Sequence, residues 1–116
     1  MAASKNPRAR LLHIRDEIDG VAAIIKGLSF EQYQESYLHR RAVERAAQIV
    51  SEAAKAMRPE LLERHGDAPW KSIIGIGNVL RHEYQRLDDR QLWEIATVHL
   101  PALGPIVRRM LEELRN

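Results

Sequence analysis

The chain has 116 residues, of which 45% are hydrophobic and 29% charged, a composition typical of one soluble globular domain, so we expect a single domain over residues 1–116. It has no cysteine, which excludes disulfides and thiolate metal sites and fits the reducing cytoplasm, our expected location. The net charge of +2 permits an anionic partner without requiring one. We expect no membrane segment and no signal peptide, because no apolar run is long enough to cross a bilayer.

The first half of the chain predicts two long helices. Residues 1–6 are expected to be a frayed end, and Pro7 to lie in the first turn of a helix whose apolar residues recur at spacings of three and four as far as Ile25. Ser29 and Gln32 have the spacing of a capping box. They predict a second helix over residues 30–57, about 40 Å long at the standard rise, with room for a kink near residues 37–41.

Shorter helices are expected in the second half. Pro59 ends the second helix, one helical turn follows in residues 60–65, and Trp70 lies in the first turn of the next helix. Asp88 and Gln91 again have capping-box spacing, and they predict a further helix after a connector at residues 85–87.

Two proline sites divide the C-terminal part. Leu100-Pro101 is expected to interrupt the helix that begins near Asp88, and Gly104-Pro105 to lead into a last helix. Nothing has the pattern of a strand. The predicted fold is therefore an all-α bundle with two long antiparallel helices and about three shorter ones.

One predicted helix end carries most of the reactive side chains. Asn78 and His82 are four residues apart and share a helix face, while Gly77 and Arg81 share the adjacent face. Helical side chains lean toward the N-terminus, so Arg81 should lie over the turn that begins at Gly77, which has no side chain to block it. With the phenol of Tyr84, this group can hold a phosphate and move a proton.

That chemistry suits RNA cleavage by the substrate's own 2′-hydroxyl. The reaction needs a base, an acid and a cation for the charge on phosphorus. His82 is the natural base or acid, and two copies of it across a dimer could divide the roles. We expect Arg81 to stabilise charge, Asn78 to orient a phosphate oxygen or the imidazole, and Tyr84 to donate a hydrogen bond.

Structural interpretations of the same residues stay open. His82 can serve as a cation at a helix C-terminus, Asn78 can end a helical turn, and Tyr84 can pack its ring. Arg41 and Arg45 are either a solvated face or RNA-binding residues, if the second helix lies near the motif. No metal and no cofactor is expected, because the histidines lack metal-ligand spacing (His13, His39, His65, His82, His99).

Residues 70–84, with residues 92–95 and 100–103, resemble the HepT-like members of the HEPN superfamily, as do residues 41–55 of the second helix. The resemblance covers the chain from about Arg10 onward. It implies a HEPN-type bundle that forms a homodimer with its two motifs face to face. It also implies a metal-independent endoribonuclease, the toxin of a type VII toxin–antitoxin system. The implied partner is a nucleotidyltransferase antitoxin, which in some systems attaches AMP to the motif tyrosine, here Tyr84.

The sequence departs from that family at one position. In the family's motif an arginine is followed by four to six other residues and then by the histidine, and the position five before His82 is Gly77 instead of arginine. Asn78, His82 and Tyr84 match the family's other motif residues, and we expect Arg81 to supply the missing cation. The alternative is a degenerate HEPN module that binds a nucleotide or docks a nucleotidyltransferase without ribonuclease activity. A purely structural helical dimer is the third interpretation.

Overall fold

The computed structural model describes residues 6–115, apart from the side chain of Tyr84, and the frayed end predicted for residues 1–6 lies almost wholly outside that range. The described residues form helices and contain no strand, which confirms the predicted all-α fold. In chain order the elements are α1 (Pro7–Ile25), α2 (Phe30–Glu35), α3 (Tyr37–Lys55), α4 (Pro59–Glu63), α5 (Trp70–His82), the 3₁₀ turn η2 (Tyr84–Arg86), α6 (Asp89–Glu94), the π-helical turn η3 (Ile95–His99) and α7 (Leu100–Glu113). Within this range no helix is both long and apolar enough to cross a membrane.

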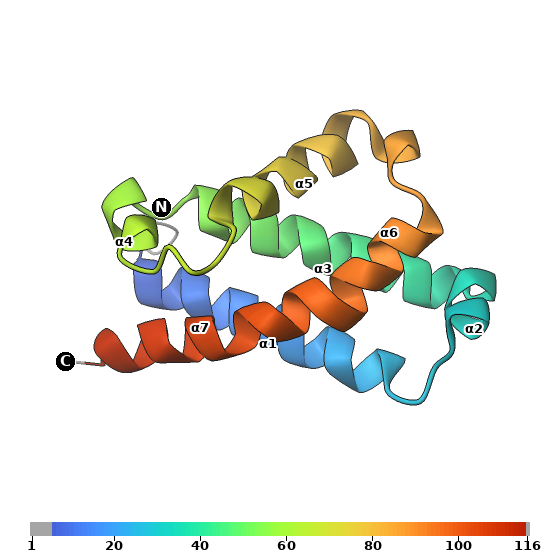
Figure 1. Cartoon of the computed structure of the whole chain (residues 1–116), viewed down its shortest axis with the longest axis horizontal. Helices are drawn as coiled ribbons and strands as arrows, with labels where there is room; N and C mark the ends of the chain where they lie inside the picture. Colours follow the sequence, from blue (N-terminus) through green and yellow to red (C-terminus); the bar gives the residue numbers. More distant parts are fainter. Residues whose placement is uncertain (1–5, 116) are drawn as a thin grey trace.

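Helix α3 lies at the centre of the bundle (Figure 1). It packs against α1 on one side and against α5 on the other, and α7 packs against α1. The long helices α1 and α3 run antiparallel, as predicted. The face of α3 that contacts its neighbours is made mostly of small side chains, which allow close approach: Val43, Ala46, Ala47, Val50, Ser51, Ala53 and Ala54. Leu11 and Ile14 of α1 are fully buried, each worth roughly 1.5–3 kcal/mol relative to exposure.

The prediction of one continuous second helix over residues 30–57 is wrong, because the chain breaks at Ser36. Ser36 has an extended backbone (φ −101°, ψ 106°), and its hydroxyl accepts a hydrogen bond from the backbone N–H of His39 at 3.3 Å. It therefore caps the start of α3. Leu38, in the first turn of α3 after this break, is 77% exposed.

The predicted interruption at Leu100-Pro101 is also wrong, since α6, η3 and α7 run on as one continuous rod (Figure 1). A proline lacks the N–H of a regular α-helical turn and clashes with the carbonyl four residues back. The π-helical turn widens the helix just before Pro101, and the Leu100 N–H donates to the carbonyl of Ile95. Pro105 lies inside α7 instead of starting a new helix.

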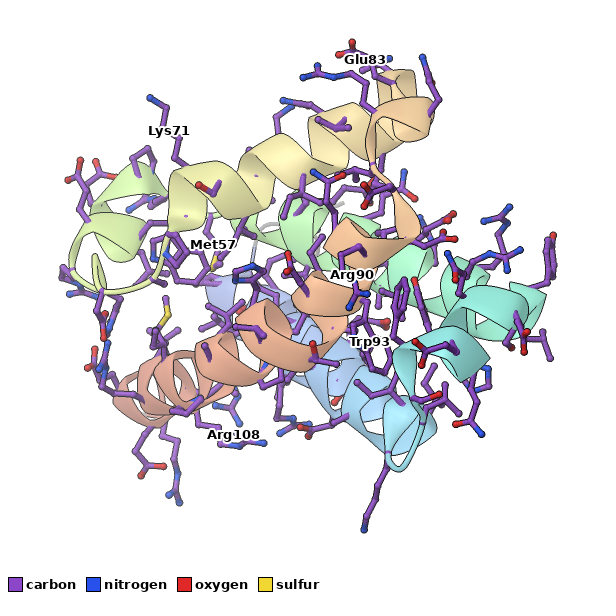
Figure 2. The ribbon with its side chains drawn as sticks, turned by 45° about the vertical axis from the view of Figure 1, so that its right-hand side comes forward. Met57, Lys71, Glu83, Arg90, Trp93 and Arg108 are labelled. Atoms are coloured by element: carbon purple, nitrogen blue, oxygen red, sulfur yellow. The ribbon has the colours of Figure 1, made fainter. Side chains whose placement is uncertain are left out.

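Aromatic side chains join α2 to α6 (Figure 2). The ring of Trp93 lies 5.2 Å from that of Tyr33 and 6.2 Å from that of Phe30, measured between centroids. The guanidinium of Arg90 lies 3.8 Å from the centroid of Phe30, in a cation–π contact. Tyr33 is fully buried, and burial raises the pKa of its phenol well above the ordinary value. This cluster fixes the end of the bundle at which α3 begins.

Candidate active site at the end of α5

Helix α5 carries the predicted motif in its last two turns. The helix ends at Glu83, whose backbone leaves the helical region (φ −145°) and whose N–H donates to the carbonyl of Val79 at 2.7 Å. Arg81 and His82 lie in the last turn, where positive charge is favoured by the helix dipole. Local structure thus places two basic side chains at an exposed helix end.

Ser51 of α3 binds α5 directly and explains Gly77. Its hydroxyl is buried, accepts from the Gly77 N–H at 3.1 Å and donates to the carbonyl of Ile74 at 2.9 Å. A Cβ atom at position 77 would lie 2.1 Å from that hydroxyl oxygen and 2.7 Å from the Ser51 Cβ. The family's arginine therefore cannot occupy position 77 unless α5 moves away from α3. The space expected for Arg81 is filled mainly by Ser51.

Arg81 nonetheless reaches back toward Gly77, as the four-residue spacing predicts. Its Nη1 lies 3.6 Å from the position of a Cβ at Gly77. Its Nη2 donates to the side-chain oxygen of Asn78 at 2.5 Å, and Nη1 is 3.7 Å from a carboxylate oxygen of Glu52. A guanidinium has five N–H donors, so these two contacts hold the group in place and leave donors for an anion.

His82 and Asn78 are both exposed on the last turns of α5. No hydrogen bond joins them, and within the described residues the His82 ring takes part in no hydrogen bond or ion pair. Asn78 contacts Arg81 instead of the imidazole. The backbone of Tyr84 begins η2, directly after α5, while its side chain lies outside the described part of the structure.

The arginines of α3 border a groove beside the motif. Arg41, Arg45 and Leu80 of α5 line this groove together with Glu44 and Gln48, and its volume is about 380 Å³. Arg41 pairs with Glu44 at 2.7 Å, and Arg45 donates to Gln48 at 3.2 Å. This part of α3 therefore lies next to the motif helix α5, which is the condition under which Arg41 and Arg45 were expected to bind RNA. The RNA contact itself stays a prediction.

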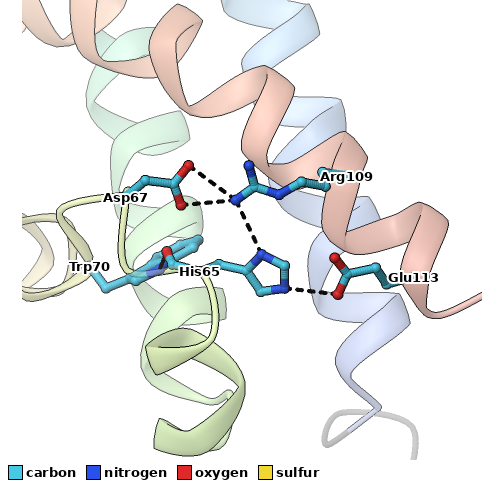
Figure 3. Close-up of polar contacts among 5 residues, drawn as sticks. All are labelled: His65, Asp67, Trp70, Arg109 and Glu113. Carbon is cyan, nitrogen blue, oxygen red and sulfur yellow. Dashed lines mark hydrogen bonds and ion pairs between the residues drawn. The ribbon is translucent and has the colours of Figure 1, made fainter.

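A polar network not anticipated from the sequence anchors the start of α5 (Figure 3). Arg109 of α7 donates to both carboxylate oxygens of Asp67, at 2.8 and 3.1 Å, and this hydrogen bonding lowers the pKa of Asp67. Arg109 also donates to Nδ1 of the buried His65 at 3.2 Å, so the ring proton is on Nε2, which donates to Glu113 at 3.1 Å. Trp70 donates to the backbone carbonyl of His65 at 2.9 Å.

This network joins the loop before α5 to α7, and the hydrogen bond from Trp70 ties the first residue of the motif helix to that loop (Figure 3). No spacing rule could have found it, because its contacts between the loop and α7 join residues more than forty positions apart. Among the described residues there is no group of three or more metal-ligating side chains positioned to hold an ion.

Known proteins similar to this chain are ribonucleases by name. The family model described as "Ribonuclease HepT-like" matches residues 14–110. A candidate RNase of Caldanaerobacter subterraneus subsp. tengcongensis is 35% identical over 109 residues, which cover 94% of this chain and 97% of that protein.

More distant relatives come from archaea. A candidate RNase of Methanocaldococcus jannaschii is 27% identical over 101 residues, 87% of this chain and 93% of that protein. The probable ribonuclease HepT of Thermococcus cleftensis is 27% identical over 90 residues, 78% of this chain and 82% of its own. No solved structure matches the chain significantly. From the matched residues and the motif at the end of α5, this chain belongs to the HepT-like ribonuclease family.

Proposed function

We propose that this chain is a metal-independent endoribonuclease of the cytoplasm and the toxin of a type VII toxin–antitoxin system, with a nucleotidyltransferase as its antitoxin. The observation that carries the proposal is the grouping of Asn78, Arg81 and His82 on one exposed helix end. The groove with Arg41 and Arg45 lies beside that end and offers a path for a phosphate backbone. Family membership supports the reaction class.

The proposed reaction uses the RNA's own 2′-hydroxyl as nucleophile. Its oxygen attacks the adjacent phosphorus while the imidazole of His82 takes its proton, and the bond to the 5′-oxygen breaks as that oxygen receives a proton. The products are a 2′,3′-cyclic phosphate and a 5′-hydroxyl. Arg81 stabilises the negative charge on the phosphorane, and Asn78 positions Arg81 through their hydrogen bond. The side-chain oxygen of Asn78 thus holds the Arg81 guanidinium, while its NH₂ group is left to donate to a phosphate oxygen.

A homodimer completes this scheme. One imidazole cannot be free base and protonated acid at the same moment, and each chain has a single histidine at this helix end. Two copies related by a two-fold axis, with the α5 ends face to face, would supply both. The exposed position of His82 is compatible with such an arrangement.

The experiment that tests the proposal is single-turnover cleavage of RNA by the purified full chain in EDTA. Cleavage should persist, with a cyclic phosphate at the new 3′ end, because the scheme uses only side chains. Sedimentation of the same sample at micromolar concentration should show a dimer. Loss of cleavage on chelation, restored by a divalent ion, would contradict the mechanism, and an active monomer would contradict the shared site.

Control by the antitoxin gives a second prediction. Incubation with the cognate nucleotidyltransferase and ATP should attach AMP to Tyr84, adding negative charge and bulk beside the proposed RNA site. Mass spectrometry of the tryptic peptides measures the modification. Tyr33 and Tyr37 are internal controls, and Tyr84→Phe should escape both modification and any loss of activity that depends on it. A neutralised protein with an unmodified Tyr84 would point to inhibition by binding alone.

The alternative is a binding module without nuclease activity. Two observations favour it: position 77 cannot accept the family's arginine, and Glu52 lies 3.7 Å from the guanidinium proposed as its substitute. A carboxylate so close lowers the positive potential that a phosphate would meet. RNA or nucleotide binding without any cleavage in the assay above would select this alternative.

A further inference from the structure

An exposed aromatic side chain begins α3, four residues before Arg41 of the groove described above. Tyr37 is 63% exposed and its neighbour Leu38 is 77% exposed. The guanidinium carbon of Arg41 lies 4.9 Å from the centroid of the Tyr37 ring, in a cation–π contact. Large apolar side chains that are exposed next to each other mark a binding surface more often than single exposed apolar side chains do. Neither residue has a role in the cleavage scheme.

Tyr37 belongs to the same ridge as the groove arginines. Tyr37, Arg41, Arg45 and Gln48 follow one another at spacings of four, four and three along α3, so they lie on one helix face. At 1.5 Å per residue this ridge is about 16 Å long, the span of a few nucleotides. Leu80 of α5, two residues before His82, lines the groove together with Arg41, Arg45 and Gln48 of this ridge. An aromatic ring and two guanidiniums therefore lie in a row on α3, beside the motif helix.

We propose that Tyr37 and Arg41 form a platform on which an unpaired base of the RNA stacks, so that the protein takes single-stranded RNA. This inference rests on the proposed function, because it assigns the class of RNA that the same site accepts. Bases of single-stranded RNA stack on aromatic rings and on guanidinium planes, whereas the faces of paired bases are covered by their neighbours in a duplex.

The contacts of Arg41 support this geometry. Its Nη1 donates a hydrogen bond to Glu44 at 2.7 Å, which holds the guanidinium over the tyrosine ring before RNA binds. RNA binding therefore does not have to order a long flexible side chain. Arg45, one turn further on, donates only to the neutral Gln48 among the described residues and retains its charge for a phosphate. The platform would thus hold a base while Arg45 contacts the backbone between that base and the cleavage site.

The test measures RNA binding by the full chain carrying His82→Ala, so that binding is not followed by cleavage. Fluorescence anisotropy compares a labelled single-stranded oligonucleotide with a duplex of the same sequence. Tyr37→Ala should weaken single-strand binding roughly tenfold, while Tyr37→Phe should keep the parental affinity because the ring remains. Val98→Ala, which removes another exposed side chain (56%) from η3, is the matched control and should change nothing.

Two results would overturn the platform: equal binding by the parent and Tyr37→Ala, or equal losses in Tyr37→Ala and Tyr37→Phe. Absence of RNA binding by the parent protein would overturn it as well. Cleavage assays separate it from the proposed function. RNA that is bound through Tyr37 but never cleaved leaves the platform standing and removes the nuclease. If RNA is cleaved, Tyr37→Ala should raise KM about tenfold with kcat little changed, and an unchanged KM would count against the platform alone.

Discussion

His82→Ala should lower the single-turnover rate of RNA cleavage by roughly 10²- to 10⁴-fold, the usual contribution of a positioned general acid or base. The imidazole lies on the exposed last turn of α5 with no partner among the described residues, so it is free to meet a 2′-hydroxyl or a leaving oxygen. The fold should be unaffected, because an exposed side chain outside any described contact contributes little to stability.

The matched control is His13→Ala, which removes an exposed imidazole from α1 and should leave the rate unchanged. Circular dichroism of both variants checks the helices. If His82→Ala cleaves at the rate of the wild type, His82 is only a favourable cation at the end of α5, and the proposed mechanism is wrong. Mixed dimers of wild-type and His82→Ala chains would show whether both copies are needed.

Local sequence rules predicted those features of the fold that are decided within a few residues. The helix start at Pro7 and the capping boxes at Ser29 and Asp88 are present as expected, because each depends on residues only a few positions apart. The break at Ser36 was missed, although serine is a good N-cap, because helix-forming residues continue on both sides of it.

Proline was overestimated as a helix breaker in the C-terminal part. The rule that proline ends a helix assumes a regular α-helical turn before it. The π-helical turn at Ile95–His99 changes that turn, and packing of α7 against α1 favours a continuous helix. Whether a chain breaks or widens at a proline is decided by such tertiary contacts, which the sequence does not display.

In the candidate site, too, the features decided within one helix could be predicted and the contacts between helices could not. The position of Arg81 beside Gly77 followed from a four-residue spacing within one helix. The partners supplied by α3 could not be predicted: Ser51 lies 26 residues from Gly77 in the sequence, and Glu52 follows it. A lone hydroxyl on the alanine-rich face of α3 was the available signal, since a buried serine needs partners.

Arg81→Ala should slow cleavage by about a hundredfold or more, as when other charge donors to a transition state are removed. The guanidinium is held by Asn78 and lies next to Glu52, with further N–H groups available to a phosphorane. Arg81→Lys should recover little of the loss, because a single ammonium cannot bond Asn78 and grip two phosphate oxygens together. Single-turnover rates of the three proteins measure both effects.

Two further variants separate catalysis from folding. Glu52→Gln removes the carboxylate near the guanidinium and should leave the rate equal or higher, since it frees Arg81 for phosphate. The Arg81–Glu52 ion pair is partly exposed and worth at most about 1 kcal/mol, so thermal unfolding of Arg81→Ala should change little. Gly77→Leu is not a clean test of the path of Arg81, because any side chain at 77 collides with Ser51 and separates α5 from α3.

The size of the Arg81→Ala effect decides which cation replaces the family's arginine. A loss of a hundredfold with an unchanged melting temperature would mean that a guanidinium four residues further along α5 reaches the same phosphate. An unchanged rate would mean that Arg81 does not replace the family's arginine. Arg41 or Arg45, whose guanidiniums line the groove with Leu80 of the motif helix, would then be the next candidates. The double variant carrying both Arg81→Ala and Arg45→Ala tests whether the two cations act together. A loss of transition-state stabilisation in the double variant that exceeds the sum of the two single losses would show that the two cations act on one phosphate.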